Sequence, residues 1–328
     1  MPAPALSASA QAALERRRAQ GRFRRGALLA MLGLMLLIWS AGVLAYAPQG
    51  NWLGLLLVIY IGACVGVGLG LYIASPSHKR PQARRPIIFM VGLLLLLLAL
   101  FSDHGNMQIE GLFFGLLLGS APYILLHFVL VKVVGPLAIG RIWCGWACWF
   151  GAVFDLLSYP FSRYRHAALF SRLRYVHFGL SLLLVLTLAL TGANGALGAE
   201  GYAWFVVGLL AYYVAGVGLA FTLKDNRAFC KYLCPLAVLL KAGARYSLLK
   251  IDGVAARCDG CKVCVERCPM NVRIDDYIRK GQRVTSSECV LCMTCINLCP
   301  QDALRLSLRT DAERHEWLDY VPPLRRRR

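Results

Sequence analysis

Six long apolar stretches constrain this chain more than any other feature of its sequence. A helix needs about 20 apolar residues to cross about 30 Å of hydrocarbon. The stretches that reach or approach this length cover residues 27–47, 52–74, 86–101, 112–134, 174–192 and 203–223. The chain is 58% hydrophobic and only 16% charged, whereas a soluble domain carries about 25% charged residues. The sequence therefore predicts an all-α polytopic membrane domain with six transmembrane helices.

The basic residues predict how these helices are oriented. Lys and Arg occur in the N-terminal arm and in the connections after the second, fourth and sixth stretches, but they are absent from connections 48–51, 102–111 and 193–202. Because cytoplasmic connections are enriched in Lys and Arg, we expect both termini in the cytoplasm of a bacterial inner membrane, with the first stretch as an uncleaved anchor. This distribution also accounts for the net charge of +19 without nucleic-acid binding.

Two copies of one cysteine run lie near the C-terminal end. The chain reads CDGCKVCVERCP from Cys258 and CVLCMTCINLCP from Cys289. Both runs have the C-x2-C-x2-C-x3-C-P spacing of bacterial ferredoxins, in which the fourth cysteine binds the other cluster. Zinc sites favour two C-x2-C pairs set well apart, and disulfides are rare in a reducing compartment. We therefore predict two [4Fe–4S] clusters, cluster I on Cys258, Cys261, Cys264 and Cys299, and cluster II on Cys289, Cys292, Cys295 and Cys268.

Two further cysteine pairs lie beside the predicted membrane helices. Cys144 and Cys148 belong to GRIWCGWACW, and Cys230 and Cys234 belong to FCKYLCP. On a helix the C-x3-C spacing places both sulfurs of a pair on one face, so all four thiols could meet at one depth. Three interpretations fit them: an additional metal centre, a redox-active thiol group, or residues for helix packing and partner docking.

The order of these four motifs resembles the NapH/NosR/MauN-type membrane-bound polyferredoxins over roughly residues 140–300. In one departure, Trp149 stands where the family has proline, so we expect Cys148 to stay helical. The resemblance implies a membrane-anchored electron relay between the quinol pool or a cytoplasmic donor and a periplasmic respiratory oxidoreductase, without independent catalytic activity. The matching positions are Arg141, Cys144, Gly145, Trp146 and Cys148, then Cys230, Cys234 and Pro235, and the eight ferredoxin cysteines.

The expected organisation has four parts: a basic arm at 1–26, the membrane domain at 27–250, a small α+β two-cluster ferredoxin module at 251–308 and a basic tail at 309–328. Membrane lipid, redox proteins of a respiratory chain and quinol are the expected partners, and His127 and Lys132 are the candidates for quinol binding. Two other functions fit the same motifs, namely an accessory factor for maturation of a respiratory metalloenzyme and a redox-sensing membrane regulator.

Overall fold

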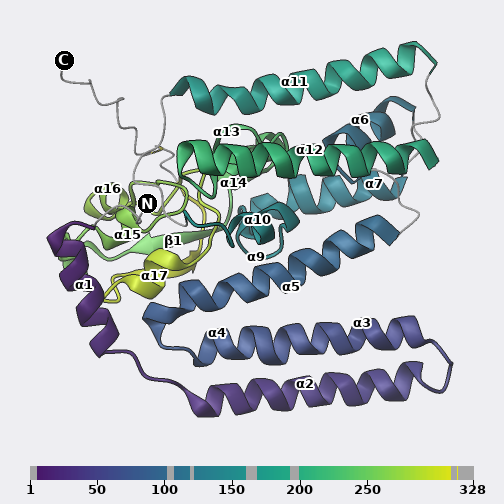
Figure 1. Ribbon diagram of the computed structural model, residues 1–328. Coiled ribbons are helices and arrows are strands. Elements are labelled where there is room, and N and C mark those ends of the chain that lie inside the picture. The colour runs from purple at the N-terminus through teal and green to yellow at the C-terminus, as the bar shows by residue number, and fades with distance from the viewer. Residues whose placement is uncertain are drawn as a thin grey trace.

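Long apolar helices form one part of the molecule, and a compact cysteine-rich module covers one end of them (Figure 1). The computed structural model describes residues 6–101, 107–118, 122–159, 168–192, 199–311 and 316. Within these residues five helices are long and apolar enough to cross a membrane. They are α2 (Arg25–Tyr46), the continuous path of α3 (Trp52–Ala63), η1 (Cys64–Leu69) and α4 (Gly70–Ala74), then η2 (Ser77–Lys79) with α5 (Arg80–Phe101), α11 (Ala168–Leu190) and α12 (Ala199–Leu223).

Of the fourth predicted span, 112–134, the structure describes α6 (Ile109–Leu118) and α7 (Pro122–His127), and residues 119–121 lie outside the described residues. The path continues through η3 (Phe128–Val134) and α8 (Gly135–Ile139), then bends by 95° into α9 (Ile142–Trp146) and α10 (Trp149–Phe154). Gly140 lies at the bend with φ +60°, which glycine adopts without steric cost. The helical stretches Leu125–Ile139 and Ile142–Phe154 form a bent pair, which is the sixth candidate span if the pair is counted as one.

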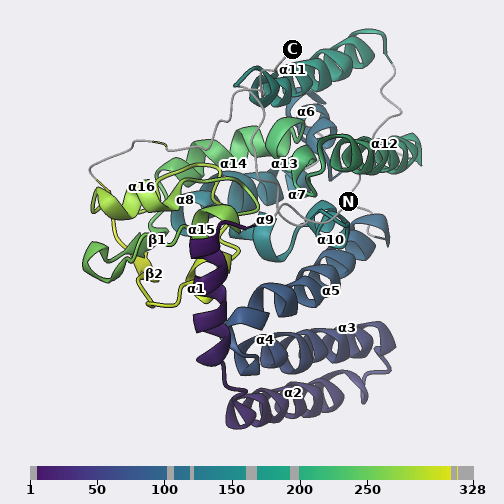
Figure 2. The same ribbon diagram turned by 60° about the vertical axis from the view of Figure 1, so that its left-hand side comes forward.

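The cysteine-rich module is small and follows the sixth apolar stretch. After α12 the chain forms α13 (Ala228–Tyr232) and α14 (Leu236–Arg245), then strand β1 (Leu249–Gly253), which pairs antiparallel with β2 (Leu304–Leu308). Between the strands lie η5 (Ala255–Arg257), α15 (Val263–Glu266), α16 (Ile274–Arg279) and α17 (Thr294–Leu298). Figure 2 shows this module against one end of the helices. The predicted fold class, a helical membrane domain with a small ferredoxin-like region, is therefore confirmed.

One hydrophobic core joins the module to the membrane helices. Phe150 and Phe154 of α10 and Tyr212 of α12 belong to the same buried cluster as Ile251 of β1 and Val290. A shared core holds two parts in a fixed relation, whereas a flexible linker would not. The module is thus positioned against the helix ends.

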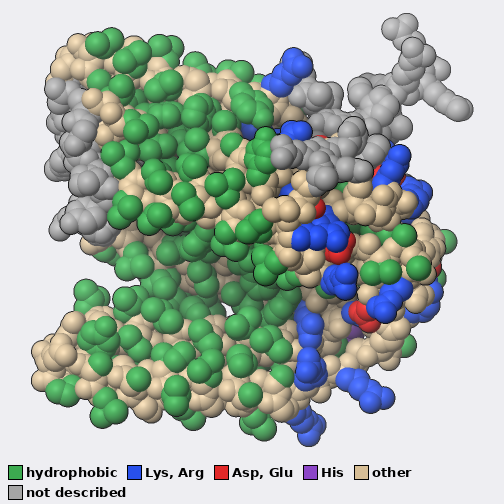
Figure 3. Space-filling view, turned by 180° about the vertical axis from the view of Figure 1, so that it is seen from behind, with side chains coloured by type: hydrophobic (Ala, Val, Ile, Leu, Met, Phe, Trp, Pro, Cys, Tyr) green, Lys and Arg blue, Asp and Glu red, His purple; other side chains and the backbone are tan. Residues whose placement is uncertain are grey.

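The N-terminal arm contains α1 (Ala8–Ala19), which packs on the module. Ala10 and Ala13 are fully buried in a cluster with Val263 and Leu298. Arg17 donates to the Asn297 carbonyl and pairs with Asp302 at 2.7 Å. Figure 3 shows Lys and Arg gathered at this end of the molecule, while the helices present hydrophobic side chains. The charged end and the cysteine-rich end are therefore the same.

Candidate iron–sulfur site

The two ferredoxin runs have matching backbones. Each run, taken with the two residues that follow it, has three positions with positive φ, and the positions correspond one to one between the copies. The pairs are Gly260 (φ +70°) with Leu291 (+49°), Lys262 (+59°) with Met293 (+59°), and Asn271 (+54°) with Asp302 (+46°). Non-glycine residues seldom adopt this conformation, so a fold must impose it. The repeated sequence spacing is therefore a repeated loop structure.

The thiols of the two runs lie within electrostatic range of one another. Cys264 interacts with Cys261 and Cys258 of its own run and with Cys299 of the other. Cys295 interacts with Cys292 and Cys289 of its own run and with Cys268 and Cys264 of the other. Backbone N–H groups point at the two crossing sulfurs, from Val272 to Cys268 Sγ and from Ala303 to Cys299 Sγ, each at 3.4 Å. Such N–H···S hydrogen bonds tune the reduction potential of a bound cluster.

The donor set fits a polynuclear cationic group. The pKa of the Cys289 thiol is raised to about 12 and that of Cys268 to about 11, mainly by burial and to a smaller extent by the neighbouring thiols. Bound metal reverses this effect, because a coordinating thiol is deprotonated outright. Across the described ranges no three His, Cys, Asp or Glu side chains converge on a position for a single metal ion. A cubane needs no such convergence, since each cysteine binds a separate corner.

The two C-x3-C pairs prove to be copies of one longer motif. Arg141-x-x-Cys144-x3-Cys148 recurs as Arg227-x-x-Cys230-x3-Cys234. Both copies start with a short helix, α9 or α13, and then turn in the same way. The N–H of Cys148 bonds the Trp143 carbonyl at 2.9 Å, and that of Cys234 bonds the Phe229 carbonyl at 2.8 Å.

The expectation that each pair lies on one helix face is wrong. Cys148 is extended (φ −72°, ψ 124°), and its carbonyl accepts from Ala152 as the next helix begins. Proline is thus not needed after Cys148, because the turn between α9 and α10 already takes this residue out of the helix. Trp149 therefore gives no reason to separate the two motifs.

All four membrane-face cysteines line one cavity of about 330 Å³. Cys144, Cys148, Cys230 and Cys234 share it with apolar side chains of α5 and α14 and with His127 and Lys132. Cys234 lies within electrostatic range of the other three thiols. The structure thus brings together two pairs that are 82 residues or more apart in the sequence (148 to 230).

A buried ion triad supports this cavity. Arg227 pairs with Asp155 at 2.7 Å and donates to the Cys144 carbonyl at 3.0 Å, so it connects one motif to the other. Arg84 of α5 pairs with the same Asp155 at 2.6 Å. Burial alone would raise the pKa of Asp155, but the two guanidinium groups lower it to about 2. Sequence reasoning missed Arg227 as a site residue, although its place in the repeated motif matches that of Arg141.

A second buried ion cluster, of one acid and three cations, connects the first motif to the ferredoxin module. Glu288, immediately before Cys289, pairs with Arg141 at 3.1 Å, with Arg174 of α11 at 3.0 Å and with Lys241 of α14 at 2.7 Å. Glu288 is almost fully buried, so these cations are needed to compensate its charge.

The first motif and the second ferredoxin run are in direct backbone contact. Trp146 donates its indole N–H to the Leu291 carbonyl at 2.9 Å. Gly145 lies against the same loop, and a Cβ added there would clash with the Val290 carbonyl oxygen. The Cys289–Cys292 loop therefore contacts the first membrane-face motif directly.

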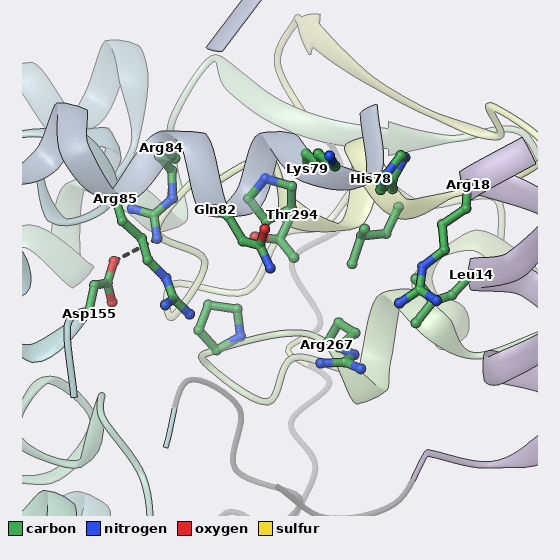
Figure 4. Close-up of a pocket in the computed structure, with 13 residues that line it drawn as sticks. Leu14, Arg18, His78, Lys79, Gln82, Arg84, Arg85, Asp155, Arg267 and Thr294 are labelled. Atoms are coloured by element: carbon green, nitrogen blue, oxygen red, sulfur yellow. Dashed lines mark hydrogen bonds and ion pairs between the residues drawn. The ribbon is translucent and has the colours of Figure 1, made fainter. Parts of the chain in front are cut away.

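A basic cavity of about 610 Å³ lies where α1, η2, α5 and the module meet. Figure 4 shows Arg18, Lys79, Arg85 and Arg267 arranged around it, with the Arg84–Asp155 pair at one side. Four cations and one compensated acid make this cavity suited to an anion.

Comparisons with known proteins agree with this arrangement. A "4Fe-4S binding domain" family model matches residues 121–168 and 200–250, which hold the two membrane-face motifs, and a "4Fe-4S dicluster domain" model matches 257–304. An uncharacterized protein of Methanocaldococcus jannaschii is 28% identical over 57% of this chain and 72% of its own length. The ferredoxin-type protein NapH of Haemophilus influenzae is 27% identical over 60% of this chain and 69% of its own length.

A third relative names the kind of chemistry. The thiosulfate reductase electron transfer subunit PhsB of Salmonella typhi is 28% identical over 28% of this chain and half of its own length. No solved structure matches the chain. The cysteine loops, the apolar helices and these relatives lead to one conclusion: the chain is a membrane-associated polyferredoxin-type [4Fe–4S] protein with a role in electron transfer.

Proposed function

We propose that the chain relays electrons between quinol, or a cytoplasmic donor, and a respiratory oxidoreductase with a periplasmic active site. The observation that carries this proposal is the contact between Gly145 and Trp146 of the first motif and the Cys289–Cys292 loop. This contact connects a cavity inside the apolar helices to the ferredoxin module. A bound cluster supplies one-electron transfer, while the protein sets its potential through burial and hydrogen bonds.

We assign cluster I to Cys258, Cys261, Cys264 and Cys299, and cluster II to Cys289, Cys292, Cys295 and Cys268. Cluster II is then proximal to the membrane, because its loop contacts the first motif. In the cluster I loop Asp259 and Gly260 are exposed, whereas Val290 and Leu291 at the matching positions of the cluster II loop are buried, so cluster I is the one that a soluble partner can approach. The order of the centres along the relay follows from this: membrane-face cysteines, cluster II, cluster I, with the direction of electron flow set by the donor.

We further propose that Cys144, Cys148, Cys230 and Cys234 hold a third iron–sulfur cluster. Their shared cavity and the match of the "4Fe-4S binding domain" model to both motifs support this assignment over a packing role. Each [4Fe–4S] cluster carries four iron atoms, so three clusters predict about twelve per chain and two predict about eight.

Iron and sulfide counting on anaerobically purified protein, with EPR, tests the cluster number. Replacing Cys144 or Cys230 with serine should lower the count from about twelve iron atoms to about eight and remove one EPR signal. The matched control is Cys64→Ser in η1, outside the cavity, which should leave the count unchanged. A wild-type count of eight would limit the chain to the ferredoxin clusters.

The relay itself is tested by adding quinol to the purified, cluster-loaded protein and following the clusters optically. Quinol should reduce them, and an oxidised partner enzyme should reoxidise them. Reduction by dithionite with none by quinol would exclude quinol as the donor.

For the basic cavity of Figure 4 we propose anionic lipid headgroups as ligands.

A further inference from the structure

A second cavity, of about 400 Å³, lies among α6, α11 and α12 and contains ionisable groups within an apolar region. The cluster of Ile109, Phe113, Phe114 and Val185 borders it, and Glu110 and His177 line it. By sequence, Glu110 was expected in the connection 102–111, but the structure packs it against Ser181 of α11 and Tyr212 of α12. Ionisable side chains at such positions are costly and generally functional.

Glu110 has one oxygen in use and one without a partner. Its Oε1 accepts from the Ser181 hydroxyl and the Tyr212 hydroxyl, each at 2.7 Å. Its Oε2 is buried and has no hydrogen-bond partner among the residues that the structure describes. A buried acceptor left unpaired costs about 1–3 kcal/mol. A ligand hydroxyl in this cavity would satisfy it.

His177 offers a second acceptor in the same cavity. Its Nδ1 lies 2.8 Å from the Leu233 carbonyl oxygen, and since a carbonyl can only accept, Nδ1 carries the hydrogen. The neutral ring then has an unprotonated Nε2, which can take a proton. Leu233 is bonded to Cys234, so this imidazole lies one hydrogen bond and one peptide unit from a membrane-face cysteine.

The cavity opens towards the hydrocarbon region. Leu180, Leu184, Trp204 and Val207 line it, and each is 43–60% exposed on the apolar surface of the helices. A lipid-soluble molecule can therefore enter from the side. Its volume lies within the range of about 300–1,000 Å³ that is usual for small-molecule sites.

We infer that this cavity is the quinol-oxidation site, with Glu110 and His177 as the two proton acceptors. The inference rests on the proposed function, in which quinol donates electrons. Oxidation to the quinone releases two protons and two electrons. One hydroxyl proton passes to Glu110 Oε2 and the other to His177 Nε2. The electrons leave one at a time towards the iron–sulfur centre at Cys234, and two oxidised centres of the relay accept one each. His127 and Lys132 line the cysteine cavity instead.

The test compares quinol and dithionite as reductants of the cluster-loaded protein. Glu110→Gln and His177→Gln should each slow quinol-dependent cluster reduction by about 100-fold, the usual contribution of a positioned base. Dithionite needs no proton acceptor, so its rate should not change. The matched control is Glu15→Gln on the exposed face of α1, outside this cavity, for which the quinol rate should equal that of the wild type.

Binding gives a second readout. Menaquinone should quench the fluorescence of Trp204, measured as the difference between the wild type and Trp204→Phe, and Leu184→Phe should weaken this quenching by narrowing the entrance. Glu110→Gln should keep the quenching while losing the rate.

Unchanged quinol rates in Glu110→Gln and His177→Gln, with a wild type that quinol reduces, would overturn this site and leave the relay intact. A slowed His127→Gln with normal Glu110→Gln would move the site to the cysteine cavity. If dithionite reduces the wild type and quinol does not, then quinol is not the donor and this cavity is not a quinol site.

Discussion

Gly145 shows at the scale of one residue how the membrane domain and the module come into contact. A Cβ at this position would clash with the Val290 carbonyl oxygen, which belongs to the backbone and cannot rotate away as a side chain could. We predict that Gly145→Ala destabilises the protein by about 1–3 kcal/mol, the usual cost of overpacking, and weakens magnetic coupling between the membrane-face centre and cluster II. Thermal unfolding in detergent and EPR measure the two effects. The control is Gly179→Ala in α11, where the added Cβ meets nothing within 4 Å.

Asp155 carries a second prediction at this scale. Asp155→Asn leaves the guanidinium groups of Arg84 and Arg227 buried without their counter-charge, and breaking a buried pair in this way costs about 3–5 kcal/mol. Denaturant unfolding should show this loss. Arg305→Gln removes an exposed guanidinium, and Asp252 keeps its pair with Arg309, so this substitution should cost less than about 1 kcal/mol. Equal effects of the two substitutions would mean that the triad has no special role.

Helix α1 carries the prediction at the scale of an element. Ala13 is buried against the module, whereas its neighbour Ala12 faces solvent. Ala13→Asp should detach α1, because an unpaired carboxylate cannot be buried without large cost, and trypsin should then cleave rapidly after Arg16–Arg18. Ala12→Asp has the same charge on the exposed face and should leave cleavage slow. Fast cleavage in both variants, or in neither, would contradict the docked position of α1.

The elements also show which features the sequence could predict. Apolar length identified the helices, and cysteine spacing identified the ferredoxin loops, because both signals are local and repeat. Gly140 lies against Leu291 and Leu249 of the module, and the extended Cys148 belongs to the turn between α9 and α10, so helix propensity alone did not find either feature. The sequence places Glu110 in a connection, because no residue near it in the chain indicates that it accepts hydrogen bonds from Tyr212 and Ser181. The Arg-x-x-Cys-x3-Cys repeat is visible in the sequence, and a comparison of its two copies identifies Arg227 as the counterpart of Arg141.

At the scale of the whole molecule, the position of charge predicts how the protein sits in a membrane. The basic residues and the ferredoxin module share one end, and the turn around residues 48–51 between α2 and α3 has no Lys or Arg. Since basic connections stay in the cytoplasm, we predict that a green fluorescent protein fused after Arg328 fluoresces and that alkaline phosphatase fused there is inactive. Both reporters inserted after Gly50 should give the opposite result. The reverse pattern would place the clusters in the periplasm and exclude a cytoplasmic donor, because such a donor could not reach cluster I.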